Sequence, residues 1–185
     1  MLRSIFIAGT ILMLASTPLA QAGKYNPVLS IGDKAPAWKD LPGIDGKRHS
    51  LSELKNAEAI VLVFTCNSCP YAIDYEERLI ALTKKFADSK VSVVAVNVNK
   101  IPEDNFEAMR ERAKTQGFNF TYLFDETQQI AKDYGATYTP EFFVLDRQRK
   151  IAYMGALHDI PNAKKVTVQH VATALTPPLT NKHPA

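Results

Sequence analysis

The sequence feature that most constrains the fold is a switch of hydrophobic period around residue 70. Residues 60–64, Ile-Val-Leu-Val-Phe, form a continuous apolar run, which is typical of a strand buried on both faces. Beyond Pro70 an apolar stripe recurs at helical spacing, at Tyr75, Leu79, Leu82 and Phe86. A buried strand followed at once by an amphipathic helix predicts an α/β fold.

The rest of the chain continues this alternation of strands and helices. Residues 24–59 are an irregular entry with a hairpin-turn signal at Asp45-Gly46. Further strands are expected at residues 91–98, 142–145 and 151–154, and helices at 103–116, from a capping box at 125–128 to Gly135, and around 168–175 up to Pro177-Pro178. The order predicts one domain over residues 23–176, a mixed central sheet with helices on both faces, followed by a tail at 177–185.

Composition limits the classes of function. The chain has 185 residues, of which 46% are hydrophobic, enough for one domain with a sizeable core. A net charge of +3, with only scattered basic pairs, gives no footprint for nucleic acid. Two cysteines are too few for a fold held together by several disulfides.

The first 22 residues predict a signal peptide. Met-Leu-Arg precedes a short apolar run at residues 5–15, and Ala20-Gln21-Ala22 fits a cleavage site. The run is shorter than the about 20 residues that span a membrane. We therefore expect a mature chain that starts near Gly23, is periplasmic or secreted, and meets the membrane only during export. Disulfides persist in those compartments.

The two cysteines lie in residues 66–69, Cys-Asn-Ser-Cys, between the buried strand and the helix. Pro70 suits the first helical position, which places Cys69 at the N-cap. A thiolate there meets unpaired N–H groups and the positive end of the helix dipole, so Cys69 is expected to be nucleophilic. Cys66 can reach back to close a disulfide, and such a pair can cycle between dithiol and disulfide. A structural disulfide, a zinc half-site and an inert buried pair are the weaker interpretations of the same residues.

The residues around the two cysteines, together with four other stretches of the chain, resemble a known family. The resemblance is carried by residues 31–36 (Ile-Gly-Asp-Lys-Ala-Pro), 63–71 (Val-Phe-Thr-Cys-Asn-Ser-Cys-Pro-Tyr), 123–128, 134–136 and 139–146. Together these stretches are similar to the thioredoxin-like redoxins, and most of all to the peroxiredoxin-like AhpC/TSA branch. The resemblance implies a thioredoxin-like fold and identifies Thr139-Pro140 as a cis-proline dipeptide that lies against the cysteines and binds substrate backbone.

The positions of the two thiols depart from thioredoxin, in which the leading cysteine begins the helix and its partner follows three residues later in the first turn. Here Cys69 stands at the leading position and Cys66 lies on the loop side. Cys69 is therefore expected to attack and Cys66 to resolve the mixed disulfide, with the reverse assignment left open. Thioredoxins bury an acid beneath the pair, but residues 60–64 are all apolar, so this proton relay is expected to be absent. No bound cofactor is implied. The expected partners are protein thiols or disulfides and a redox partner protein.

Two other activities remain as alternatives. A thiol peroxidase needs a hydroxyl three residues before its attacking thiol and an arginine nearby, whereas Cys66 occupies that position and no arginine lies near Pro140 in the sequence. A Cu(I) metallochaperone would use the two soft thiolates. The copper-delivery proteins of this fold also supply a histidine near the proline, for which His158 is the nearest candidate.

Overall fold

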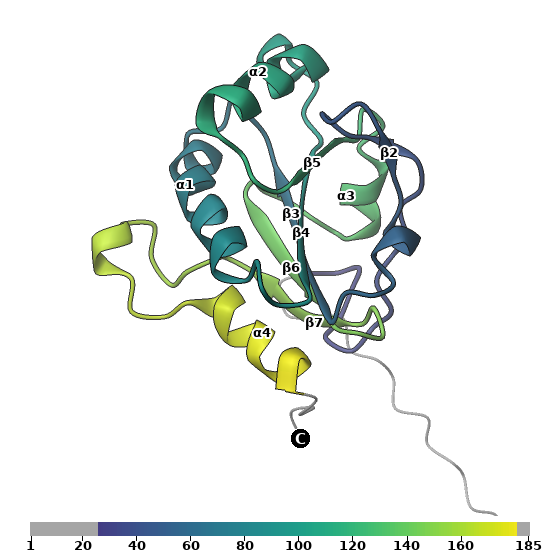
Figure 1. Ribbon diagram of the computed structural model, residues 1–185, viewed down its shortest axis with the longest axis vertical. Coiled ribbons are helices and arrows are strands. Elements are labelled where there is room, and N and C mark those ends of the chain that lie inside the picture. Colours follow the sequence, from purple (N-terminus) through teal and green to yellow (C-terminus); the bar gives the residue numbers. More distant parts are fainter. Residues whose placement is uncertain (1–25, 181–185) are drawn as a thin grey trace, which may run out of the picture.

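The computed structural model describes residues 26–180, which fold around one five-stranded sheet (Figure 1). The strands are β1 (Leu41–Pro42), β2 (Arg48–His49), β3 (Ala59–Thr65), β4 (Val91–Asn97), β5 (Thr121–Phe124), β6 (Glu141–Leu145) and β7 (Ile151–Gly155). The α-helices are α1 (Pro70–Lys85), α2 (Phe106–Gln116), α3 (Gln129–Asp133) and α4 (His170–Thr180), and the 3-10 helices are η1 (Leu51–Leu54), η2 (Pro102–Asp104) and η3 (Ala163–Lys165). The expected signal peptide, the start near Gly23 and residues 181–185 lie outside the described residues.

The central sheet is mixed, as the sequence predicted. Its strand order is β5-β4-β3-β6-β7, with β3 parallel to β4, β4 parallel to β5, and β6 antiparallel to both β3 and β7. The central strand β3 is buried from Ala59 to Phe64, which explains its unbroken apolar run. Because β3 is the central strand, the loop that follows it emerges in the middle of the sheet, at the end where β3 stops.

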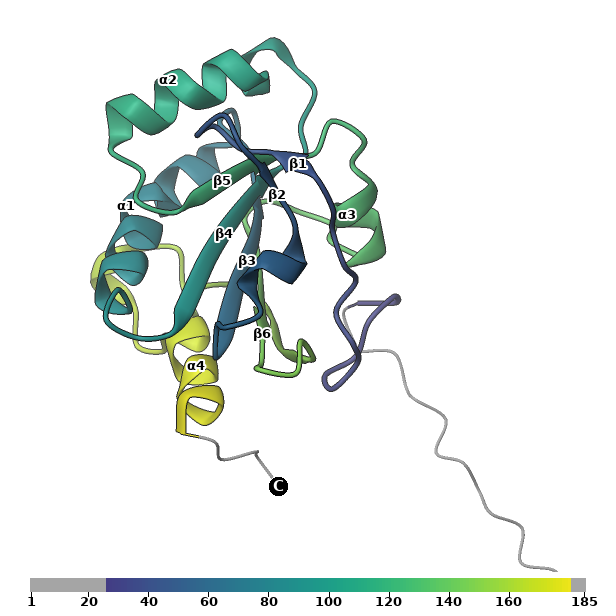
Figure 2. The same ribbon diagram turned by 45° about the vertical axis from the view of Figure 1, so that its right-hand side comes forward.

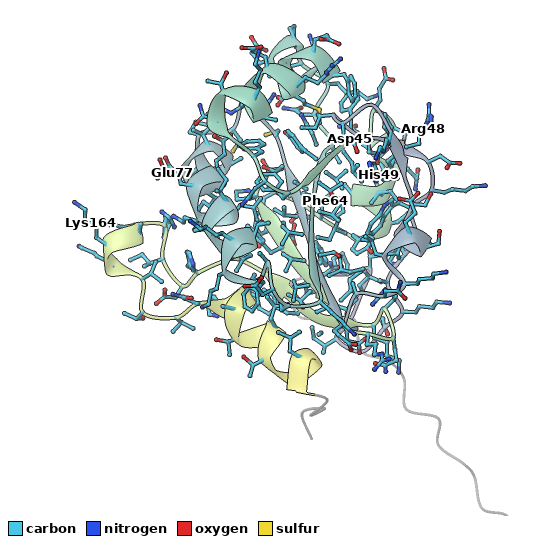
Figure 3. The ribbon with its side chains drawn as sticks, in the orientation of Figure 1. Asp45, Arg48, His49, Phe64, Glu77 and Lys164 are labelled. Atoms are coloured by element: carbon cyan, nitrogen blue, oxygen red, sulfur yellow. The ribbon has the colours of Figure 1, made fainter. Side chains whose placement is uncertain are left out.

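Helices cover both faces of the sheet (Figure 2). One core joins β3 to α1, α2 and α4 through residues such as Val61, Leu79 and Met109. The other core joins β3 to α3 and η1 through residues such as Leu62 and Ile130. Alternate residues of β3 thus face opposite cores, as strand geometry requires. In Figure 3 Phe64 lies at the centre of the molecule, whereas Glu77 and Lys164 point outward.

The N-terminal segment reaches both outer strands of the sheet. The hairpin β1–β2 turns at Asp45-Gly46 as predicted, and the ring of His49 lies 3.1 Å from the Asp45 carboxylate (Figure 3). Next to this turn, the Ile44 N–H donates to the carbonyl of Tyr122 on β5 at 3.1 Å. At the opposite edge, the Ile151 N–H of β7 donates to the Asp33 carbonyl at 2.8 Å.

Two expected helix boundaries are wrong. The residues at 125–128 do not form a capping box: Asp125 accepts from the N–H of Ile130, and the Gln128 side chain bonds the Val98 carbonyl instead of reaching back. Helix α3 therefore starts at Gln129. The last helix does not end at the two prolines but continues to Thr180. Proline's fixed φ is helical, so its cost is limited to the missing N–H and the ring contact with the preceding turn.

Two further elements differ from the sequence prediction. Strand β5 was not expected, because its four residues, Thr-Tyr-Leu-Phe, are too few to show a period. The helix expected at 103–116 is broken: η2 ends at Asp104, Asn105 caps α2, and α2 starts at Phe106. Within residues 26–180, no helix is both long enough and apolar enough to cross a membrane.

Candidate active site

The two cysteines lie where β3 ends and α1 begins. Cys66 follows Thr65, the last residue of β3, and is 5% exposed. Cys69 is the N-cap of α1, with Pro70 at the first helical position, as predicted from the sequence. Cys69 is partly exposed, so the two thiols differ in access: Cys69 can meet a substrate sulfur from outside, whereas Cys66 lies behind it.

Thr139 contacts both sulfurs. Its hydroxyl oxygen lies 3.5 Å from the Sγ of Cys66, and its carbonyl oxygen accepts from the Sγ of Cys69 at 3.5 Å. The peptide bond between Thr139 and Pro140 is cis. The expectation that this dipeptide is cis and lies against the cysteines is therefore confirmed, while its contact with substrate backbone stays a prediction.

The pKa of the Cys69 thiol lies below its ordinary value. Burial alone would raise this pKa, but hydrogen bonds to the sulfur outweigh the burial. They come from the backbone N–H groups of Ala72 and Tyr71 in the first turn of α1, and from the side chains of Thr139 and Cys66. The helix start therefore favours the thiolate, which is the nucleophilic form of cysteine.

A buried carboxylate lies beneath the loop between the cysteines. Asp104, at the end of η2, has no exposed surface. Its Oδ1 accepts from the backbone N–H groups of Asn67 and of Ser68, the latter at 3.3 Å. Its Oδ2 accepts from the Ser68 hydroxyl at 2.6 Å and from the Asn99 side chain at 2.8 Å, and the Asn97 side chain donates to its backbone carbonyl at 3.1 Å.

Asn67 fixes the same loop from its other side. Its side-chain N–H donates to the Glu103 carbonyl at 3.0 Å, and its Oδ1 accepts from the hydroxyl of Tyr122 on β5 at 2.9 Å. Burial raises the pKa of Tyr122, and the negative charge of Asp104 raises it further, so the hydroxyl stays a donor. The loop that carries the thiols is thus held by η2, β4 and β5 together.

Sequence reasoning missed Asp104. The residue fell inside the helix expected at 103–116, where an acidic side chain is ordinary. A signal was present: Asn105 is a favoured N-cap residue, and its side chain does cap α2 by accepting from the N–H of Ala108 at 2.9 Å. A helix that starts after Asn105 leaves Asp104 in the preceding turn, free to face the cysteine loop.

Glu141 is a second buried carboxylate near the site. It follows the cis-proline on β6, is 5% exposed, and accepts from the Thr137 N–H at 2.8 Å. Burial raises the pKa of Glu141, against the opposing effect of hydrogen bonds from the backbone N–H groups of Thr137 and Tyr138. Through the hydrogen bond from the Thr137 N–H, the Glu141 carboxylate holds the loop that carries Thr139.

A groove of about 390 Å³ opens beside Cys66. It is lined among others by Thr139, Tyr138, Asn99, Gln128 and Lys132. Tyr138 on its rim is 51% exposed, and Tyr71 at the start of α1 is 64% exposed. The thiols are therefore bordered by exposed aromatic rings and by hydrogen-bonding side chains.

The residues considered for the two alternative activities have other partners in the described structure. Within residues 26–180 the arginines contact other groups: Arg48 the Asp40 carbonyl, Arg78 His158, Arg110 Glu107, Arg112 Glu76, Arg147 Glu58 and Arg149 the Ala57 carbonyl. None of these contacts involves Cys69. His158, the residue considered for copper, stacks on Tyr75 and accepts from Arg78 at 3.4 Å. Within the same residues no cluster of three or more His, Cys, Asp or Glu side chains forms a metal site.

The chain is similar in sequence and fold to known proteins. The chain is 25% identical over 153 residues to the thiol-disulfide oxidoreductase ResA of Geobacillus thermodenitrificans, an alignment that covers 81% of this chain and 83% of the relative. A solved structure of an uncharacterized conserved protein from Geobacillus kaustophilus is similar with a TM-score of 0.77 and 34% identity, covering 83% of this chain and 84% of that one. A solved structure named as a candidate thiol:disulfide interchange protein DsbE, from Chlorobium tepidum, has a TM-score of 0.67 and 25% identity, covering 82% and 99%.

These similarities show a thioredoxin-like fold and a redoxin related to thiol-disulfide oxidoreductases. The family model described as AhpC/TSA matches residues 31–154, from the N-terminal segment through β7. That range contains both cysteines, the cis-proline and the buried Asp104. The chain belongs to the AhpC/TSA family.

Proposed function

We propose that this protein is an exported thiol–disulfide oxidoreductase that exchanges disulfides with protein thiols through Cys69 and Cys66. The observation that carries the proposal is that the two thiols, although both contact Thr139, differ in solvent exposure. Both contact Thr139, but Cys69 is partly exposed with a lowered pKa, whereas Cys66 is buried behind it. This is the arrangement that a nucleophile and a resolving thiol require.

In the reducing direction the reaction has two steps. The Cys69 thiolate attacks a substrate disulfide, forms a mixed disulfide and releases the first substrate thiolate. Cys66 then attacks the Cys69 sulfur, closes the intramolecular disulfide and releases the second thiolate. Two electrons pass from the cysteine pair to the substrate, and the oxidising direction is the reverse sequence. A redox partner protein restores the starting state.

The groove beside Cys66 supports a polypeptide substrate. Tyr138, next to Thr139, and Tyr71, two residues after Cys69, are both exposed, while the backbone of Thr139 lies at the cysteines. A substrate chain laid along Thr139 would bring its own sulfur to Cys69. The relatives ResA, a thiol-disulfide oxidoreductase, and the candidate thiol:disulfide interchange protein DsbE both have this activity in their names.

The export part of the proposal rests on residues 1–22, which have the three parts of a signal peptide. We expect the exported chain to begin near Gly23, which mass spectrometry of the intact protein recovered from outside the cytoplasm would show. A protein that keeps its first 22 residues and stays in the cytoplasm would contradict this part alone.

The test of the exchange activity is the reduction potential of the cysteine pair. The protein is equilibrated with glutathione buffers, and its dithiol fraction is measured by thiol alkylation and mass spectrometry. We expect a potential between about −270 mV, typical of a reductant, and about −120 mV, typical of an oxidant. A value well below about −300 mV would indicate a structural disulfide and would overturn the proposal.

The single-cysteine variants provide the matched controls. Cys66→Ser should form a lasting mixed disulfide with a substrate at Cys69, whereas Cys69→Ser should form little, because the remaining thiol is buried. Trapping at Cys66 alone would reverse the two roles. Stoichiometric Cu(I) binding without redox cycling, or peroxide consumption that needs only Cys69, would favour the corresponding alternative.

A further inference from the structure

The groove beside Cys66 gives a small molecule access to a thiol that is too buried for a second protein to reach. Cys66 is 5% exposed, and the groove of about 390 Å³ is lined by Cys66 but not by Cys69. A space of this volume suits a small ligand. We propose that a low-molecular-weight thiol that carries a carboxylate binds in this groove next to Lys132 and reduces the cysteine disulfide by attacking Cys66. This inference rests on the proposed exchange function, to which it adds a small-molecule source of electrons beside the partner protein.

The position of the groove fits the direction of attack on a disulfide. A thiolate attacks along the line of the S–S bond, from the side opposite the sulfur that leaves. A groove that includes Cys66 and not Cys69 offers that approach to Cys66. The Thr139 hydroxyl, 3.5 Å from the Cys66 sulfur, belongs to a residue of the same lining. A polypeptide laid along Thr139 would meet Cys69 instead, so the two kinds of partner approach different sulfurs.

Cys69 is the better leaving group of the pair. Burial raises the pKa of its thiol, but hydrogen bonds from the first turn of α1 and from Thr139 outweigh burial and hold the pKa below its ordinary value. A thiol of low pKa leaves a disulfide faster. Attack on Cys66 expels Cys69 as a thiolate at the start of α1, where that form is favoured. The leaving group and the groove therefore select the same sulfur for attack.

Lys132 is the one charged side chain among the described residues that line the groove. It lies in the last turn of α3 and is exposed. None of the ion pairs within residues 26–180 involves it. The neighbouring carboxylate of Asp133 accepts from the Gln129 side chain at 2.7 Å. A ligand carboxylate would therefore meet an uncompensated positive charge at Lys132.

The other lining residues suit the body of a small thiol. Phe64, Val98 and Ala131 supply apolar surface, and Phe64 and Ala131 belong to the core beneath the groove. The Gln128 side chain donates its N–H to the Val98 carbonyl at 2.8 Å, which leaves its own carbonyl oxygen for a ligand N–H. The groove thus combines a positive charge, an apolar wall and one of the two thiols.

The reaction balances in atoms and electrons. The sulfur of the small thiolate forms a bond to the Cys66 sulfur, the bond between Cys66 and Cys69 breaks, and Cys69 leaves with the electron pair as a thiolate. A second small thiolate attacks the small sulfur of the mixed disulfide, forms a small disulfide and releases Cys66, which takes a proton from water. Two small thiols are oxidised, and the cysteine pair gains two electrons.

The experiment compares three thiols of similar size and different charge: mercaptopropionate, which is anionic, mercaptoethanol, which is neutral, and cysteamine, which is cationic. The oxidised full-length protein is mixed with each at low concentration, and disulfide reduction is followed by acid quenching and mass spectrometry. The quantity compared is the rate of the variant divided by that of the unchanged protein, so that the intrinsic reactivity of each thiol cancels. Lys132→Glu should lower this ratio for mercaptopropionate by about 3- to 10-fold relative to mercaptoethanol and raise it for cysteamine, because one exposed charge pair changes a rate by up to about 5-fold.

Lys164→Glu is the matched control. It makes the same change of net charge on η3, where the Lys164 side chain points outward (Figure 3). It should leave the ratios for the three thiols equal to one another. At about 1 M salt, where the screening length falls to about 3 Å, the differences caused by Lys132→Glu should largely vanish. A loss that is the same for all three thiols would show a structural change instead of charge recognition and would overturn the inference.

The intermediate identifies the sulfur that is attacked. N-ethylmaleimide is added shortly after mercaptopropionate, so that the freed protein thiol is alkylated before the disulfide closes again. Fragmentation of the peptide that contains residues 66–69 then locates both groups. We expect mercaptopropionate on Cys66 and maleimide on Cys69, and the opposite arrangement would overturn the inference.

The outcomes separate this inference from the proposed function. Attack at Cys69, or rates that do not respond to the charge at Lys132, would overturn the small-thiol route while exchange with protein substrates through Cys69 still stands. If Lys132→Glu does not fold, Lys132→Gln decides, and it should show about half of the effect on a logarithmic scale. A disulfide that neither the three thiols nor a protein thiol reduces would overturn the proposed function itself.

Discussion

Thr139 is the residue on which the chemistry of both thiols converges. Its hydroxyl meets the buried sulfur and its carbonyl meets the exposed one. The loop that carries it is held by Glu141, which accepts from the Thr137 N–H. Because a charged carboxylate is expensive to bury, this support depends on protonation state.

The stability of the protein should therefore depend on pH through Glu141. Its pKa is raised by burial, so the native state binds the proton more tightly than the unfolded state. The free energy of unfolding then loses a contribution as pH rises from the ordinary glutamate range through the raised value. Glu141→Gln removes this loss: the variant and the parent should be similarly stable near about pH 4, and the variant relatively more stable near about pH 7.

Urea unfolding at several pH values measures this difference. The Thr137 N–H can still donate to the glutamine oxygen, so the loop contact persists in the variant. A difference that is independent of pH would contradict the assignment.

At the scale of single residues, the sequence predicted the site residues whose positions are set by their neighbours in the sequence. Cys69 was placed correctly at the N-cap because Pro70 marks the first helical position, and the cis bond at Thr139 followed from the family resemblance. The N-cap residue Asn105 could have placed Asp104 before the helix, but the contacts of Asp104 with Asn67, Ser68 and Asn99 could not be predicted, because they form only in the folded protein. No local pattern of residues records such contacts.

At the scale of elements, the start of α2 decides where Asp104 lies. Asn105 ends η2 and caps α2, so the chain turns between the two and directs Asp104 toward the cysteine loop. The long helices and the central strands were predictable because their periods are sustained over many residues. The short strand β5 and the turn between η2 and α2 were not, since three or four residues carry no period.

Loss of this cap should weaken the protein measurably. Asn105→Ala removes the acceptor for the Ala108 N–H and should lower the free energy of unfolding by about 1 kcal/mol, with a range of about 0.5–2. Asn105→Ser, which keeps a capping oxygen, should restore most of it. Chemical denaturation measures both variants, and equal losses in the two would show that the cap is not the cause.

At the scale of the whole molecule, two cores share the central strand. On the α3 side the rings of Phe64, Tyr134 and Phe143 meet edge to face, with the centroids of Tyr134 and Phe143 5.1 Å apart. Such rings bury a large apolar area and fix each other's orientation. This aromatic cluster joins β3, β6 and the residue that follows α3.

Removing one ring of this cluster should cost a large share of the total stability. Phe143→Ala should lower the free energy of unfolding by about 3–5 kcal/mol, out of about 5–15 for a typical domain. Ile31→Ala is the control, because Ile31 is 60% exposed and should change the value by less than about 0.5 kcal/mol. Thermal and urea unfolding would show a loss below about 1 kcal/mol if the cluster were loosely packed.

The segment before β3 has a consequence for solubility. It donates from Ile44 to β5 and accepts at Asp33 from β7, so it covers part of both outermost strands of the sheet. Uncovered strand edges pair readily with other chains. A chain trimmed of residues 26–50 would expose both borders at once and would tend to self-associate by intermolecular strand pairing. The first residues of the fold thus protect the two outer strands from intermolecular pairing. They cover the sides of the sheet and leave the end that carries the thiols open to partners.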